Sequence, residues 1–225
     1  GLVGSEMCIR DSYISIGSYE IEKDKLIITE LPIRLWTSNY KEFIDGFKSI
    51  TENYNLNDPS KPDTNLGPVV RQSAANFIRA QINEAESSGA KCLIDESKFT
   101  ISREDNCYVS PQVMVDVNHD MRFMMEETFG PAVGIMPVDD DKEAKNLMND
   151  SPYGLTASVW TKDTEFAKDF GKSIETGTFF MNRCDYLDPA LAWTGVKDTG
   201  IGCSLSTLAF DQFTRPQSFH IRKVN

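Results

Sequence analysis

Apolar and polar residues alternate with a helical period in two stretches of the first half of the chain. The stretch "YKEFIDGFKSITENY" predicts an amphipathic helix from about residue 40 to residue 54. The stretch "PVVRQSAANFIRAQINEAESSGA" predicts a second helix, opened by Pro68 and closed by Gly89. Between them, "NLNDPSKPDTNLG" holds the Pro, Asp and Asn residues that interrupt helices, so we expect a loop there.

Shorter apolar runs predict strands. "KCLID", "CYVSPQVMVDV" (about 107–117) and "AVGIMPV" (132–138) are rich in β-branched residues and bounded by turn residues. "LTASVWT" and "GTFFMN" predict two more strands, separated by a helix in "DTEFAKDFGKSI". Strands that alternate with helices of this length predict an α/β domain whose largely parallel sheet is flanked by helices. Ligands collect at the carboxyl ends of such strands, where residues 182–185 fall.

Three carboxylates open the stretch "DDDKEAKNLMND". A cluster of acids suits the positive end of a helix dipole, so we interpret Asp139 to Asp141 as a helix-capping segment. A calcium loop would need alternating ligands and a central Gly, which are missing.

The last residues predict a helix in "SLSTLAFDQF" and then a strand in "QSFHIRK", which alternates as an edge strand does. A strand with no further element behind it needs a neighbour to pair with. Pairing with another subunit is one solution, so the pattern favours oligomerisation through this end of the chain.

Composition narrows the classes of partner. The 225 residues are 40% hydrophobic, enough for a real core. Lys and Arg number 23 against 34 Asp and Glu, a net charge of −11 with no basic run, so nucleic acid is excluded as an expected partner. No apolar run is long enough to span a membrane, and the first residues do not have the pattern of a signal peptide. We therefore expect a cytoplasmic protein with no membrane partner.

Cysteine and histidine give no metal site. The five cysteines are odd in number, scattered and nowhere spaced C-x-x-C, which favours reduced thiols; they are Cys8, Cys92, Cys107, Cys184 and Cys203. His119 and His220 are too few and too far apart for a histidine cluster. The chain also contains no G-x-G-x-x-G, P-loop, G-x-S-x-G or H-E-x-x-H pattern.

One stretch, "MEETFGP", places Glu126, Glu127 and Phe129 just ahead of the apolar run "AVGIMPV". On local grounds, acidic residues before Gly-Pro are typical of a solvated turn. A binding role is the alternative, and it depends on the rest of the chain.

Six motifs taken in order resemble the C-terminal half of the NAD(P)-dependent aldehyde dehydrogenase superfamily. They are "LGPVV", "YVSPQVMVDV", "MEETFGPAVGIMPV", "NDSPYGLTASVWTKD", "ETGTFFMN" and "GVKDTGIG", and the match runs from about residue 40 to residue 222. The resemblance implies that Glu127 hydrogen-bonds the nicotinamide ribose hydroxyls of NAD or NADP and that Phe129 contacts the nicotinamide.

The resemblance also implies that the loop after "FFMN" lines the aldehyde entrance, with Asp185, Tyr186 and Trp193 near the tunnel. Trp193 stands in "AWTG", where the family usually carries a P-F-G-G type motif. The bulkier indole could reshape the pocket, so substrate preference does not carry over. The alternative is that Trp193 is an ordinary core residue.

Family chemistry needs a cysteine thiolate that attacks the aldehyde, a hydride transfer to NAD(P)+ and a glutamate-activated water that hydrolyses the thioester. The thiol normally lies about a dozen residues ahead of the position matched by Tyr40. That region reads "SYEIEKDKLIITELPIRLWTSN", without a cysteine. The general-base Glu and the N-terminal dinucleotide-binding domain also have no counterpart, and we interpret Cys184 as a bystander. No catalytic residue is therefore assigned.

The resemblance gives a plan of three segments. Residues 1–38 are atypical, and their first dozen, "GLVGSEMCIRDS", look like translated adapter or assembly sequence. Residues 39–216 match part of the catalytic domain, and residues 217–225 match a C-terminal oligomerisation strand, which implies a homo-oligomer, dimer or tetramer.

We therefore expect a fragment of an oxidoreductase that oxidises an aldehyde to a carboxylic acid with NAD or NADP and that is inactive alone. Two alternatives stay open: a non-catalytic binding or oligomerisation protein with the same fold, and a semialdehyde or acyl-CoA-forming dehydrogenase. The residues that separate NAD from NADP belong to the domain without a counterpart.

Overall fold

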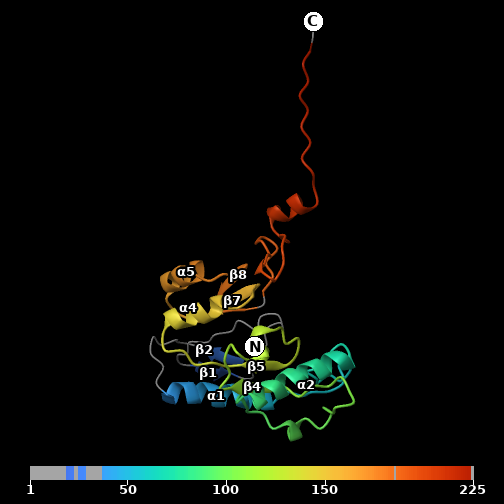
Figure 1. Cartoon of the computed structure of the whole chain (residues 1–225), viewed down its shortest axis with the longest axis vertical. Coiled ribbons are helices and arrows are strands. Elements are labelled where there is room, and N and C mark those ends of the chain that lie inside the picture. Colours follow the sequence, from blue (N-terminus) through green and yellow to red (C-terminus); the bar gives the residue numbers. More distant parts are fainter. Residues whose placement is uncertain (1–18, 23–24, 29–36, 185, 224–225) are drawn as a thin grey trace.

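A computed structural model describes residues 19–22, 25–28, 37–184 and 186–223 (Figure 1). The adapter-like first dozen residues, Cys8 and half of the region that should hold the nucleophile lie outside these residues. Within them the chain folds as sheets flanked by helices, which confirms the predicted α/β class.

Both predicted helices of the first half are present, as α1 (Thr37–Glu52) and α2 (Gln72–Ser87). The second helix begins at Gln72 rather than Pro68, because Arg71 is extended and the backbone N–H of Val69 donates to the Cys107 carbonyl. It ends at Ser87, and the predicted terminator Gly89 follows two residues later with a φ of +107°, the left-handed conformation that glycine adopts readily.

The larger core is built on β3 (Lys91–Cys92), β4 (Gln112–Val115) and β5 (Ala132–Gly134). The central strand β4 pairs antiparallel with β3 and parallel with β5. Successive side chains of β4 point to opposite faces, so Val113 packs in the cluster of Phe43 from α1, whereas Met114 packs in the cluster of Ile78 from α2. The two helices therefore cover opposite faces of this sheet.

A smaller core contains the parallel pair β7 (Thr156–Val159) and β8 (Thr178–Met181), with α4 (Asp141–Asn149) and α5 (Thr164–Lys172) beside it (Figure 1). Met148, Ala157 and Ile174 form its buried centre. The side chain of Asp140 accepts from the backbone N–H of Glu143, which confirms that the carboxylate cluster caps α4. The parallel pairs β4–β5 and β7–β8 thus hold the two cores.

The remaining strand pairs are antiparallel and short: β1 (Tyr19–Glu22) with β2 (Lys25–Ile28), and β6 (Tyr153–Gly154) with β9 (Val196–Lys197). Three short helical turns complete the fold: η1 (Glu96–Lys98), α3 (Arg122–Met125) and η2 (Thr207–Gln212).

Lys197 ties distant segments of the smaller core together. Its ammonium group donates to the carbonyls of Asn149 and Ser151 at 2.6 and 3.0 Å and lies 2.8 Å from a carboxylate oxygen of Glu175. The side chain of Asn149 makes two further bonds: its amide nitrogen donates to the Ser173 carbonyl at 2.9 Å, and its amide oxygen accepts from the Glu175 N–H at 2.8 Å.

The C-terminal segment departs from the prediction in part. The predicted helix in "SLSTLAFDQF" is the short 3₁₀-helix η2, which begins only at Thr207 because Leu205 and Ser206 have φ values of +61° and +54°, which no right-handed helix accommodates. Residues 213–223 extend away from the body and pair with no strand among the described residues (Figure 1). Pairing of this tail with another subunit stays a prediction.

No helix among the described residues has the length and the apolar character needed to cross a membrane.

Candidate functional site

The "EETFGP" loop connects α3 to β5, and its side chains from Glu127 to Phe129 are alternately exposed and buried. Thr128 is buried, with 4% of its surface exposed, whereas Glu127 is exposed and Phe129 is 53% exposed. The carboxylate and the ring predicted to bind the cofactor therefore both lie on the outer side of the loop.

The two glutamates of this loop are not equivalent. The Glu126 carboxylate lies 3.3 Å from the guanidinium of Arg122, which also binds both carboxylate oxygens of Glu84 at 2.7 Å. No described residue donates to the carboxylate of Glu127. Within the described part of the chain, the second glutamate is therefore the one whose carboxylate has no side-chain partner.

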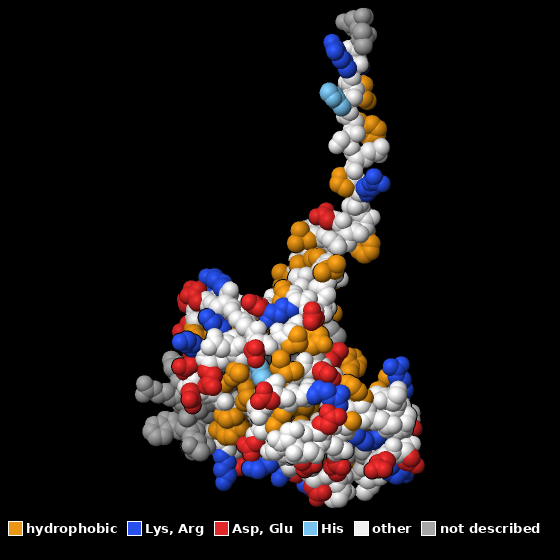
Figure 2. All heavy atoms as spheres, viewed as in Figure 1, with side chains coloured by type: hydrophobic (Ala, Val, Ile, Leu, Met, Phe, Trp, Pro, Cys, Tyr) orange, Lys and Arg blue, Asp and Glu red, His pale blue; other side chains and the backbone are white. Residues whose placement is uncertain are grey.

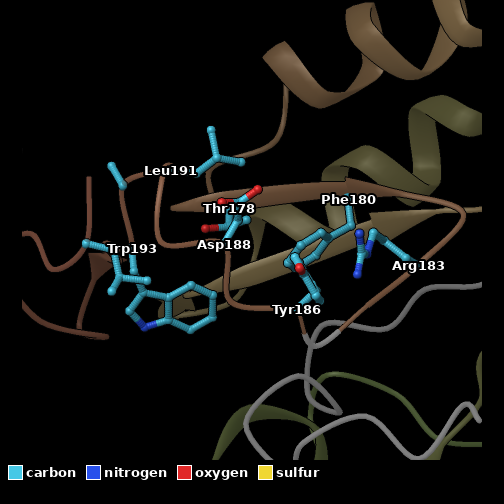
Figure 3. Close-up of a pocket in the computed structure, with 9 residues that line it drawn as sticks. Thr178, Phe180, Arg183, Tyr186, Asp188, Leu191 and Trp193 are labelled. Atoms are coloured by element: carbon cyan, nitrogen blue, oxygen red, sulfur yellow. The ribbon is translucent and has the colours of Figure 1, made fainter. Parts of the chain in front are cut away.

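A separate cavity of about 110 Å³ lies along β8, whose residues Thr178 and Phe180 line part of it (Figure 3). Tyr186 and Trp193, both predicted at the aldehyde entrance, line it. Asp185, the third predicted residue, lies outside the described residues. Glu127 and Phe129 do not line this cavity, so the structure brings together the two aromatic residues of the predicted entrance and places the predicted cofactor residues on a different loop.

Three charged or polar side chains also line the cavity: Thr178, Arg183 and Asp188. The Arg183 guanidinium lies 3.8 Å from the centroid of the Tyr186 ring, a cation–π contact, and Asp188 lies nearby (Figure 3). The Thr178 hydroxyl is buried and has no hydrogen-bond partner among the described residues. Arg183 follows the predicted strand end "FFMN" directly, which is the signal that could have identified it.

Hydrogen bonds at both ends hold the loop that carries the aromatic residues. Asn182 has φ +55° at the end of β8, and its side chain bonds both the N–H and the carbonyl of Thr161. Farther along, Trp193 and Ser204 exchange two backbone hydrogen bonds of 2.6 and 2.8 Å. The entrance loop is thus attached at both ends, which supports Trp193 as a wall of the cavity.

The described cysteines offer no obvious substitute nucleophile. Burial, with a smaller effect from Glu86 and Glu96, raises the pKa of the Cys92 thiol to about 11, so this thiol stays protonated at neutral pH. Cys184 lies in the entrance loop but does not line the cavity. Among the described residues, no three His, Cys, Asp or Glu side chains gather into a group that could hold a metal ion.

Comparison with known proteins gives consistent results. A model of the aldehyde dehydrogenase family matches residues 33–219. Vanillin dehydrogenase of Corynebacterium glutamicum is 30% identical over 185 residues, 82% of this chain and 37% of that protein. The 2-aminomuconic semialdehyde dehydrogenase of Mus musculus is 28% identical over 189 residues, 82% of this chain and 39% of that protein. The chain therefore spans under half the length of these relatives.

Solved structures agree with the sequence relatives. The NAD+ complex of an aldehyde dehydrogenase from Bacillus cereus superimposes with a TM-score of 0.72 and 26% identity, over 80% of this chain and 36% of that one. Betaine aldehyde dehydrogenase from Staphylococcus aureus, also with NAD+, gives a TM-score of 0.72 and 26% identity over 79% and 35%. The family model covers most of the chain and the fold agrees with it, so this chain belongs to the aldehyde dehydrogenase family.

Proposed function

We propose that this chain supplies the nicotinamide-binding loop and part of the aldehyde entrance of an enzyme that oxidises an aldehyde to a carboxylic acid with NAD or NADP. The single observation that carries the proposal is the difference between the two glutamates of "EETFGP". Arg122 pairs with Glu126, while Glu127 presents an exposed carboxylate to which no described residue donates.

Residue chemistry fits that role. An ionised carboxylate accepts hydrogen bonds from two neighbouring hydroxyl groups, as a ribose diol offers. Phe129, on the same outer side of the loop, presents an apolar ring that can limit the movement of a flat nicotinamide. When bound, the cofactor supplies the hydride acceptor; the chain's own residues bind and orient it.

Tyr186 and Trp193 are proposed to contact the aldehyde. Their shared cavity of about 110 Å³ has room for a small side group, and the Trp193 indole narrows it. Asp185 stays a proposed member of this entrance.

The attacking thiolate and the general base are proposed to come from polypeptide other than the described residues. The chain alone is therefore expected to form no reduced cofactor from NAD+ or NADP+ with a panel of aldehydes. We propose a cytoplasmic location, because an odd number of scattered cysteines without C-x-x-C spacing favours reduced thiols.

Glu127→Gln is expected to weaken binding of NADH to the chain about tenfold, because a neutral amide replaces a charged acceptor and one of its two acceptor atoms becomes a donor. Ligand-observed NMR titration measures the dissociation constant. Glu126→Gln is the matched control, and it is expected to bind within about twofold of the original chain because Arg122 already occupies that carboxylate. Equal affinity of the Glu127 variant and the original chain, or no binding to either, contradicts the proposed function.

We also propose that the tail pairs with a second copy of the chain. Phe213, Phe219 and Ile221 are 86%, 76% and 80% exposed, and Figure 2 shows hydrophobic side chains along a tail that nothing surrounds in this view. Exposed apolar side chains of this size mark interaction surfaces. The same segment favours the second candidate function, a non-catalytic subunit that binds other copies through its tail.

Replacing Phe219 and Ile221 together by Ser is expected to shift the chain from an oligomer to a monomer, because both side chains lie on one side of the predicted strand. Light scattering coupled to size-exclusion chromatography measures the mass. His220→Ser, on the other side of the strand, serves as the control and should leave the mass unchanged. A strictly monomeric original chain would rule the proposal out.

A further inference from the structure

Two residues of α2, one turn apart, contact the two ends of the "EETFGP" loop. The amide nitrogen of Gln81 donates to the backbone carbonyl of Glu127 at 3.4 Å. At the other end, a Cβ on Gly130 would overlap the Ile78 side chain, so the loop backbone lies directly against the helix there. Residues three apart on a helix share one face, so a single helix face supports the loop at both ends.

The next turn of α2 is linked to the residue before Glu127 through Arg122. Glu84 binds the Arg122 guanidinium through two bonds of 2.7 Å, and Arg122 in turn reaches Glu126 at 3.3 Å. The same guanidinium lies 5.1 Å from the ring centroid of Phe77, also on α2. Consecutive turns of one helix thereby determine the position of Glu126, Glu127 and Gly130.

From these contacts we infer that Gln81 is a positioning residue for cofactor binding, which acts by holding the Glu127 backbone carbonyl toward α2. With the carbonyl held inward and the Thr128 side chain buried, the Glu127 carboxylate is directed outward. This inference rests on the proposed function, because it assigns Gln81 to the ribose-binding role of Glu127.

Folding alone does not account for a glutamine at this position. Gln81 is 0% exposed, and no described residue donates to its amide oxygen. A buried acceptor without a donor lowers stability, and a leucine of similar size would avoid that cost. Leucine also removes the donor to the Glu127 carbonyl, so a purely structural role predicts a change in stability without a loss of affinity, whereas a positioning role predicts a specific loss of cofactor binding.

Gln81→Leu is expected to weaken NADH binding about fivefold while the thermal midpoint of unfolding stays the same or rises. Hydrogen exchange at the amides of residues 127–130 is expected to accelerate, because the loop loses its tether. Asn83→Leu, an exposed change of amide to apolar side chain on the same helix, is the matched control and should alter none of the three measurements.

Gln81→Glu gives a test that depends on pH. Burial raises the pKa of a carboxyl at this position, and only its protonated form can donate to the Glu127 carbonyl. Affinity for NADH is therefore expected near that of the original chain at pH 5 and to fall as pH rises to 8. The original chain and both Gln81 variants share the same charged neighbours, which are Glu84, Arg122, Glu126 and Glu127. Dividing each variant's affinity by that of the original chain at the same pH therefore removes the contribution of these neighbours. The Gln81→Leu ratio should not vary with pH.

Different results would overturn the proposed function and the positioning role of Gln81. If Glu127→Gln binds NADH as the original chain does, the proposed function is wrong. If Glu127→Gln weakens binding but Gln81→Leu changes neither affinity nor exchange, the positioning role of Gln81 is overturned. Should the leucine variant fail to fold, a Gln81→Glu ratio that does not change between pH 5 and 8 overturns it equally.

Discussion

Gly177→Ala is expected to lower the free energy of unfolding by about 3 kcal/mol, because the added Cβ would overlap the backbone carbonyl of Thr194. Both its nearest neighbours, the carbonyl oxygen and carbon of Thr194, are main-chain atoms that cannot rotate away. The Gly177 N–H also donates to the Gly154 carbonyl at 3.1 Å, so moving the Gly177 backbone away from Thr194 would break this bond. Urea unfolding followed by circular dichroism measures the loss.

Gly67→Ala is the matched control for this prediction. A Cβ at Gly67 would meet only the Pro59 ring, at 3.2 Å, so we expect a change within about 0.5 kcal/mol. Thr194 adjoins Trp193, and the Gly177 variant should therefore also disturb the entrance cavity, seen as a changed tryptophan emission. If both alanine variants lost the same free energy of unfolding, the overlap with Thr194 would not be the cause of the loss.

Phe43→Ala is expected to destabilise the chain by about 3–5 kcal/mol, because it leaves a large cavity between α1 and the β3–β4–β5 sheet. The Phe43 side chain is 1% exposed and packs in one cluster with Val113 and Ile135. Urea unfolding again provides the free energy.

Phe47→Ala removes the same ring from the next turn of α1. Its ring centroid lies 5.8 Å from that of Phe43, but Phe47 is only partly buried, so a loss of about 1–2 kcal/mol is expected. If Phe47→Ala cost as much as Phe43→Ala, burial would not be what sets the contribution of this helix.

The helices were predictable because their apolar period is carried by many residues, and burial of one face is what forms them. The strand predicted at 107–117 is only Gln112–Val115, for a reason that local sequence does not show. The Cys107 carbonyl accepts from Val69, and the Tyr108 carbonyl accepts from Arg79 at 2.7 Å. Contacts with residues far along the chain thus replace strand pairing before Gln112.

The candidate site was also predictable only in part. The motif order identified the loop of Glu127 and Phe129 and the entrance aromatics Tyr186 and Trp193, although their roles stay predictions. The pairing of Arg122 with Glu126 and the support from Gln81 depend on tertiary contacts, since Gln81 lies 46 positions before Glu127. No local pattern distinguishes a supporting glutamine from any other helical one.

The bonds of Asn149 have a consequence for covalent modification. Asn149, Asp150 and Ser151 form an Asn-x-Ser triplet, the pattern that oligosaccharyltransferase recognises for attachment of a glycan to the amide nitrogen. In the folded chain that nitrogen donates to the Ser173 carbonyl, and the amide oxygen beside it accepts from Glu175. Transfer of a glycan to that nitrogen would require the Asn149 side chain to leave contacts that join the end of α4 to the turn before β8, so we expect the folded chain to be a poor substrate for this modification.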